Sequence, residues 1–365
     1  MSVILFLLVL FVLVLVHEWG HFIVAKKTGM RVDEFGIGFP PKLFSVKKGE
    51  TEYTFNALPI GGFVRIWGEN FADAAEEKES GIDVSRSFAA RPKWAQALVL
   101  IAGVTMNILF AWFLFSLTYM IGLPTVVDEA DATSAAELSI MDVLPDSPAA
   151  VIPAGSVVNA VENENNKIEN PTPTEFSRFV TDAAPESVNV FYTYKGEDKK
   201  VSITPVQGLD KENPDRYLVG AALSLVEVVR KPFFTAISDG FVSTYNGLTG
   251  IAGGLGSLLK QTITGKADFS QVAGPVGIVG LVGEAAAYGI TALLTFTAII
   301  SLNLAVINLL PFPALDGGRL VFVAIEAVTG SHIPPVWAGR VNLLGFALLM
   351  ILMIAVTYND IARLL

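Results

Sequence analysis

The sequence of 365 residues contains no cysteine and only three histidines, His17, His21 and His332. Without cysteine, the chain forms no disulfide and offers no thiolate as a nucleophile or a metal ligand. Any metal site therefore depends on very few nitrogen ligands. Charged residues are also scarce, at 16%, whereas soluble domains carry about 25%.

Hydrophobic residues make up 52% of the chain. A soluble domain of this composition would lack the polar groups needed to cover its surface, so we expect an α-helical multi-span membrane protein. The formal net charge is -10. We expect no nucleic-acid partner, because phosphate binding requires a concentrated basic face.

Four apolar stretches are long enough to cross a bilayer, which takes roughly 20 residues. We expect these spans within residues 1–25, 94–123, 287–319 and 338–358. The first stretch could instead be a cleaved signal peptide, but it has no basic n-region and no small-residue cleavage site. Residues 225–263 combine apolar residues with Lys, Asp and Gln, which favours amphipathic helices on the outer membrane surface.

Charge predicts the orientation of these spans. Lys and Arg are concentrated in residues 26–93, between the first two spans, and Lys78 is one of them. Cytoplasmic loops are typically basic, so we expect this loop inside the cell. Residues 128–205 hold fourteen acidic and five basic residues, a balance of 5 − 14 = −9, and should face outward. With four spans, both chain termini should then lie outside as well.

The loops themselves have patterns of secondary structure. Residues 128–206 predict an inserted α+β domain, in which residues 188–194 alternate like a strand and residues 199–204 pair back after a turn. Thr174 is placed to cap a helix that begins at Glu175. Residues 26–93 predict a membrane-associated β-hairpin region around Gly61 and Gly62. A hairpin edge beside a catalytic site can hold an extended substrate; an ordinary cytoplasmic hairpin is the alternative.

The first predicted span contains the segment His17-Glu18-Trp19-Gly20-His21. On a helix, positions i and i+4 share one face, so both imidazoles can bind one Zn²⁺ at about 2.0–2.1 Å. Glu18 lies beside the first ligand and can take a proton from water. The alternative is a set of polar residues at a helix end, but polar groups inside a span are costly and usually functional.

A catalytic zinc site needs a third protein ligand and an open position. Asp316 follows the third apolar stretch, where a carboxylate needs a compensating partner. It could instead cap a helix. His332 is another candidate, in the polar segment 329–335. Because the first and third spans are both expected to run inward, Asp316 can reach the depth of the histidines near the cytoplasmic side.

Together these residues resemble the site-2 protease family, the M50-type intramembrane zinc metalloproteases, and especially its bacterial RseP type with a PDZ domain. The specific motifs are His17-Glu18-x-x-His21, Asn303, Asn308, Pro311-x-Pro313 and Leu315-Asp316-Gly317. Weaker similarities are Pro59-x-Gly61-Gly62, Ala102-Gly103 with Asn107, Gly274-Pro-Val-Gly-Ile278 and, for the PDZ-like domain, Ser147-Pro-Ala149 and Ile203-Thr204-Pro205.

The resemblance implies a multi-pass protein of the cell's inner (plasma) membrane that cleaves single-span membrane proteins within the bilayer, such as anti-sigma factors or remnant signal peptides. One Zn²⁺ per chain would be held by His17, His21 and Asp316, with Glu18 as the general base. Substrate would be positioned by Asn303, Asn308, Pro311, Gly61 and Gly62. The two asparagines could instead form hydrogen bonds between spans. The PDZ-like domain would bind a peptide or act as a spacer or size filter.

Two other functions remain open. A membrane protease that degrades damaged proteins at a cytoplasmic site would use a glutamate as third ligand, and Glu326 follows the third span. A non-catalytic scaffold would instead recruit partners through the PDZ-like domain. Bound metal separates the scaffold from both proteases.

Overall fold

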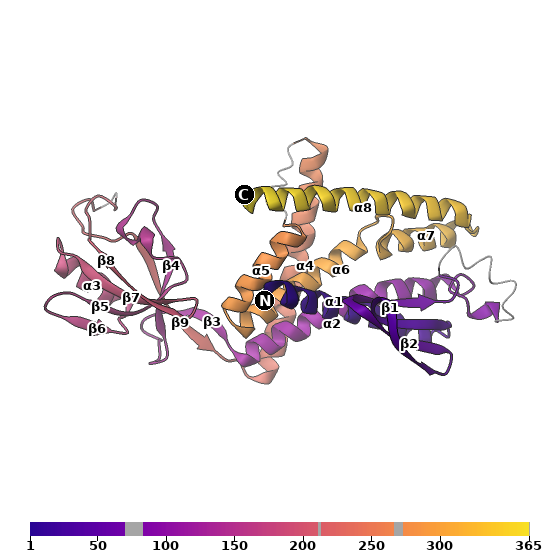
Figure 1. Ribbon diagram of the computed structural model, residues 1–365, viewed down its shortest axis with the longest axis horizontal. Coiled ribbons are helices and arrows are strands. Elements are labelled where there is room, and N and C mark those ends of the chain that lie inside the picture. Colours follow the sequence, from indigo (N-terminus) through magenta and orange to yellow (C-terminus); the bar gives the residue numbers. More distant parts are fainter. Residues whose placement is uncertain (70–82, 211–212, 266–272, 365) are drawn as a thin grey trace. The chain divides into compact units, whose positions relative to one another are not determined.

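The computed structural model describes residues 1–69, 83–210, 213–265 and 273–364. The chain divides into two compact units (Figure 1). Unit 1 combines Met1–Thr118 with Phe233–Leu365, and unit 2 is Tyr119–Pro232. Lys78, in the basic segment of the sequence, lies outside the described residues.

Within the described residues, unit 1 contains four helices that are long and apolar enough to cross a membrane. These are α1 (Ser2–Lys27), α2 (Lys93–Ile121), α6 (Ile290–Leu309) and α8 (Pro335–Leu364). Each overlaps one of the four apolar stretches. A helix satisfies its backbone hydrogen bonds internally, which is why apolar runs of this length fold as helices in lipid.

Three further helices complete unit 1: α4 (Phe233–Ile263), α5 (Pro275–Ala287) and α7 (Asp316–Thr329). The stretch 287–319, expected as one span, is divided between α5, α6 and α7. Pro311 and Pro313 explain the break between α6 and α7, because proline has no amide hydrogen to donate within a helix. The stretch 225–263 also differs from the expected set of surface helices, since its first residues form a strand and the rest forms α4 alone.

The segment before α2 forms a sheet from two long, bent strands, β1 (Val32–Lys48) and β2 (Thr51–Ile66). Both strands fold back, so that Glu34 of β1 pairs with Arg65 near the end of β2 and also with Glu52 near its start. The two strands thus form a hairpin with additional pairing, which leaves residues 62–66 at an outer edge of the sheet. This edge lies beside α1, since the amide of Val64 donates to Glu18 Oε2 at 3.1 Å.

Glu50 fastens the turn between β1 and β2 to the rest of unit 1. Its Oε1 accepts from Lys26 Nζ at 2.7 Å, and its Oε2 accepts from Arg86 Nη1 at 2.7 Å. Arg86 belongs to a short 3-10 helix, η2 (Val84–Arg86). Hydrogen bonds from Arg86 and then Lys26 outweigh partial burial and lower the pKa of Glu50 to about 2.

Unit 2 is β-rich and follows the predicted α+β pattern. Its sheet has the order β3-β9-β4-β5-β7-β8, with β6 paired to β5. The strands are β3 (Leu123–Val127), β4 (Glu137–Val143), β5 (Val157–Glu162), β6 (Lys167–Glu169), β7 (Val188–Tyr194), β8 (Glu197–Ile203) and β9 (Ala221–Val229). Helix α3 (Pro173–Ala183) and the 3-10 helix η3 (Pro148–Val151) complete the unit.

Three details of unit 2 differ from the sequence prediction. The α3 helix begins two residues earlier than expected, with Thr172 as its N-cap in a reciprocal capping box with Glu175. Thr174 lies inside the helix, where its hydroxyl donates to Glu129. The domain also extends past residue 206, because β9 pairs with β4 and supplies Leu225 to the core.

Strands β3 and β9 carry the chain into and out of unit 2. They pair antiparallel over five positions, from Leu123 opposite Val229 to Val127 opposite Leu225. The amide of Lys231 also donates to the carbonyl of Tyr119 at 2.9 Å. The two connections of unit 2 are therefore neighbours.

We expect Glu50→Gln to lower the thermal midpoint of the protein in detergent at pH 7 by a few degrees, because the two cations lose their shared anion. The folded carboxyl titrates at about 2 and the unperturbed one at 4.5. Its contribution is therefore complete above pH 4.5 and is lost as the pH falls toward 2. The difference between wild type and variant should shrink at pH 3. Glu52→Gln, which removes a more exposed pair with Lys42, is the control; an undiminished difference at pH 3 would contradict the assignment.

Candidate metal centre

His17 and His21 lie one turn apart on α1, and Asp316 joins them from the first turn of α7. The Nε2 atoms of the two histidines are 3.1 Å apart. Asp316 Oδ2 lies 3.0 Å from His17 Nε2 and 3.3 Å from His21 Nε2. Among the described residues, no other group of three His, Cys, Asp or Glu side chains comes together closely enough to hold a metal ion.

The spacing of these three atoms fits a single zinc ion. Tetrahedral ligands about 2.0–2.1 Å from zinc lie roughly 3.3 Å from one another. Both histidines are buried. Two imidazole nitrogens and one carboxylate oxygen would leave a fourth position on the ion open.

Contacts from α2 orient both imidazole rings. His21 Nδ1 lies 2.8 Å from the carbonyl of Val99, so Nδ1 carries the hydrogen and Nε2 keeps a free lone pair. His17 Nδ1 lies 3.2 Å from the side-chain amide of Asn107, whose Oδ1 is buried without a partner. Turning this amide over would let Oδ1 accept a hydrogen from His17 Nδ1. Both Nε2 atoms are then available to a metal, and such outer contacts fix the ring orientation.

Two glycines let α1 and α2 approach at this point. A Cβ on Gly103 of α2 would overlap His21 Nε2 and would lie 2.7 Å from His17 Cε1. A Cβ on Gly20 of α1 would overlap the carbonyl oxygen of Ala102. In the sequence, Ala102, Gly103 and Asn107 are indicated only by the family resemblance. The available signal for Asn107 was a polar side chain within an apolar span.

Asp316 reaches the histidines because the chain turns sharply between α6 and α7. A Cβ on Gly317 would overlap the carbonyl oxygen of Leu310, and one on Gly318 that of Phe312. These glycines therefore let the turn fold directly against the start of α7. The N-cap of α7 is Leu315, which makes no side-chain capping bond. Asp316 is the first residue inside the helix, so its side chain points to the histidines instead of serving as the cap.

A cavity of about 240 Å³ opens beside this cluster. Its lining residues come from α1, α6, the turn before α7 and the first position of α7: Val14, His17, Glu18, Leu304, Asn308, Ala314, Leu315 and Asp316. Glu18 is held by the amide of Val64, which donates to Oε2. Within the part of the chain that the structure describes, its Oε1 accepts no hydrogen bond. The site thus combines three possible metal ligands, a carboxylate and space for a reactant.

The residues expected to position substrate differ in their location. Asn308 lines the cavity, whereas Asn303 donates to Ile299 of its own helix at 2.9 Å and does not line it. Pro311 is exposed on the turn and is also not a lining residue. Gly61 and Gly62 lie against α1, and a Cβ on Gly61 would be 3.1 Å from Val14, which lines the cavity.

The alternative third ligands do not join the cluster. Glu326 Oε2 lies 2.5 Å from Lys93 Nζ and 3.6 Å from His332 Nδ1. Hydrogen bonds from Lys93 and from the amide of Ile333 outweigh burial and lower the pKa of Glu326. His332 is 76% exposed. Glu326 therefore serves as the partner of a lysine, and the cytoplasmic-site protease hypothesis lacks its ligand.

Comparisons with known proteins agree over the length of the chain. A model described as peptidase family M50 matches residues 5–352. Zinc metalloprotease RasP of Oceanobacillus iheyensis is 32% identical over 437 residues, covering 100% of this chain and 99% of that protein. The regulator of sigma-W protease RasP of Bacillus subtilis is 28% identical over 440 residues, with coverage of 100% and 99%. A protein of Clostridium perfringens is 38% identical over 362 residues, with coverage of 99% and 98%.

A solved structure matches one part of the chain. The PDZ domain of the SdrC-like protein of Listeria monocytogenes has a TM-score of 0.21 and 20% identity. The match covers 26% of this chain and 92% of that one.

We expect Gly103→Ala to reduce bound zinc to less than half of the wild-type content, because the added methyl group would displace both imidazoles. The measurement is zinc per chain in purified protein, by atomic emission. Gly280→Ala is the matched control, since nothing lies within 4 Å of a Cβ at that helical position. Full zinc content in Gly103→Ala would contradict the close packing described above.

Proposed function

The chain belongs to peptidase family M50, the site-2 proteases, and we propose that it cleaves the transmembrane segments of other membrane proteins within the bilayer. It is a metalloprotease with zinc as cofactor, as its named relatives are. One observation supports cleavage within the bilayer. The ligand cluster is built on α1, a helix that is long and apolar enough to span a membrane.

His17, His21 and Asp316 would hold the ion, and zinc bound there supplies a Lewis acid for peptide hydrolysis. Glu18 would act as general base, taking a proton from water and later passing it to the leaving amine. The hydrogen bond from Val64 to Oε2 fixes the orientation of this carboxylate. Asn107 and the carbonyl of Val99 keep the two rings turned toward Asp316.

The outer edge of β2, residues 62–66, would hold the substrate by pairing with it as an added strand. A helix hides its peptide groups in internal hydrogen bonds, so a transmembrane substrate must unwind before hydrolysis. The amide of Val64 points away from β1, and backbone groups alternate along an antiparallel pair, so those of Gly62 point the same way. An unwound segment could pair with this edge while Asn308 contacts it in the cavity. Asn303 and Pro311 would take part only after a rearrangement.

The distribution of charge supports a site on the cytoplasmic side of the inner (plasma) membrane. Lys26 and Lys27 end α1, and Lys93 begins α2 at the same end of unit 1, where it pairs with Glu326 of α7. Basic loops stay in the cytoplasm. The acidic unit 2 and both termini would then lie outside. One relative is named a regulator of sigma-W protease, and the substrate class that we propose for this chain is single-span membrane proteins such as an anti-sigma factor.

For unit 2 we propose a spacer or size filter in preference to a peptide receptor. Strand β3 already pairs with β9 from Leu225 to Val229, which leaves only residues 221–224 of β9 open on that side. A peptide that adds directly beside β9 could do so only as a very short strand, unless β3 were displaced.

Replacing residues 120–230 with a short flexible linker tests this role. The linker can be short because Tyr119 and Lys231, the residues that it would join, are hydrogen-bonded to each other. We expect the shortened protein to cleave single-span substrates with a bulky outer domain at rates similar to those with a short one. The full chain should prefer the short outer domain. The filter hypothesis fails if both proteins show the same preference.

We expect Glu18→Gln to reduce cleavage of a single-span substrate in detergent by roughly 10²–10⁴-fold, the usual contribution of a general base. The zinc content should be unchanged, because Glu18 is not among the ligand atoms and an amide oxygen can still accept from Val64. Undiminished cleavage would remove the general-base role. Loss of zinc together with activity would instead indicate a role in the fold of the site.

A further inference from the structure

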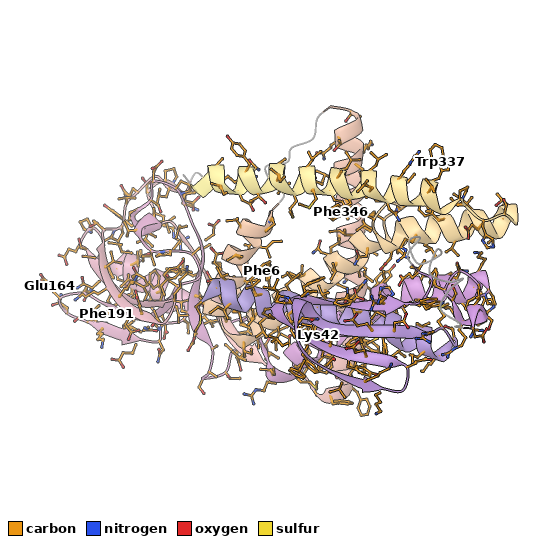
Figure 2. All side chains as sticks on the ribbon, turned by 45° about the vertical axis from the view of Figure 1, so that its right-hand side comes forward. Phe6, Lys42, Glu164, Phe191, Trp337 and Phe346 are labelled. Carbon is orange, nitrogen blue, oxygen red and sulfur yellow. The ribbon has the colours of Figure 1, made fainter. Side chains whose placement is uncertain are left out.

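The first half of helix α8 packs against the rest of unit 1 along one narrow stripe, while near its other end Asp360 accepts hydrogen bonds from the amides of Gly274 and Gly277. Only 6% of its most apolar window is buried. The side chains of Trp337 and Phe346, labelled in Figure 2, are 62% and 55% exposed. The inward positions are Ala338, Asn342 and Gly345, which share one face of a helix at this spacing. In its first half, α8 therefore contacts the rest of unit 1 through these three residues.

Asn342 is the polar member of the stripe, and it contacts the turn that precedes Asp316. Its Oδ1 accepts a hydrogen bond from the amide of Ala314 at 3.3 Å. A polar side chain within an apolar helix is costly unless it is paired, and such residues are usually functional. One turn later, a Cβ on Gly345 would lie 2.5 Å from the carbonyl oxygen of Pro313. The lack of a side chain at Gly345 therefore lets α8 lie directly on the turn.

The turn needs this support because Ala314 has a left-handed backbone, with φ of 74°. Residues with a Cβ rarely adopt this conformation. Ala314 and Leu315 line the cavity, and the next residue is Asp316. A change in the conformation of Ala314 would therefore move both the cavity wall and the carboxylate.

We propose that Asn342 is a positioning residue for the metalloprotease reaction. By accepting from the amide of Ala314, it holds the left-handed turn and so sets the place of Asp316 relative to His17 and His21. Asn342 touches neither the ligand cluster nor the cavity and acts through the turn alone. This inference rests on the proposed role of Asp316 as a zinc ligand.

The test is the zinc affinity of the full chain in detergent, measured by competition with a chelator, beside the rate of substrate cleavage. Asn342→Leu keeps the side-chain size and removes the acceptor. We expect zinc affinity to fall by about 10-fold or more, as for other residues that orient metal ligands. The matched control is Thr357→Leu on the same helix, where the hydroxyl donates to Met353 of α8 itself, and its affinity should equal that of wild type.

A second substitution separates positioning from simple packing of α8. Glycine adopts a φ near 74° without strain, so Ala314→Gly should restore zinc affinity in the Asn342→Leu background. A reduced affinity that Ala314→Gly does not restore would overturn the proposal, as would wild-type affinity in Asn342→Leu. If Asn342→Leu does not fold, Asn342→Ala with and without Ala314→Gly is read in the same way.

Asp316→Ala distinguishes this inference from the proposed function. If Asp316→Ala releases zinc while Asn342→Leu binds it like wild type, only the role of Asn342 is wrong. If Asp316→Ala binds zinc like wild type, the ligand assignment fails, and the role of Asn342 fails with it.

Discussion

The structure depends on bringing one carboxylate and two imidazoles together among apolar helices. Their contacting atoms lie 3.0–3.3 Å apart, and buried polar groups so close to one another need a shared partner such as a cation. Two features of the surrounding sequence let these three side chains meet. Gly103 removes the side chain that would separate α2 from the histidines. The turn before α7 delivers Asp316 across a gap of 299 positions in the chain.

The main features of this arrangement could be predicted from sequence because each has a local signal. Apolar runs predict the long helices, the spacing of His17 and His21 predicts a shared face, and alternation predicts β7. Features that depend on distant partners could not be predicted. The second pairing of Glu34 in β1 and the addition of β9 to unit 2 have no local signature. Thr172 and Thr174 are both good caps by type, and only the backbone shows which one begins α3.

The same reasoning explains why only one of two candidate asparagines lines the cavity. Asn303 and Asn308 are five positions apart on α6, which turns about 100° per residue, so their side chains point about 140° apart. Both cannot face one small cavity. For Asn107 and Asn342 the deciding contact lies outside their own helix. Asn107 contacts His17 of α1, and Asn342 contacts Ala314 in the turn before α7. Polar residues in apolar helices are therefore a useful signal, but their partners come only from the fold.

The pairing of β3 with β9 has a mechanical consequence. The chain enters unit 2 at Tyr119 and leaves it at Pro232. Next to the hydrogen bond from Lys231 to Tyr119, the pair of Leu123 and Val229 begins a ladder of five pairs. Tension that draws the connecting segments apart would load the hydrogen bond between Lys231 and Tyr119 first and would then separate the pairs of the ladder one after another. Since β3 is the outermost strand of its sheet, peeling would lengthen the tether while the rest of the domain stays intact. Separation of β3 from β9 would thus add a few residues of extended chain to each connection of unit 2.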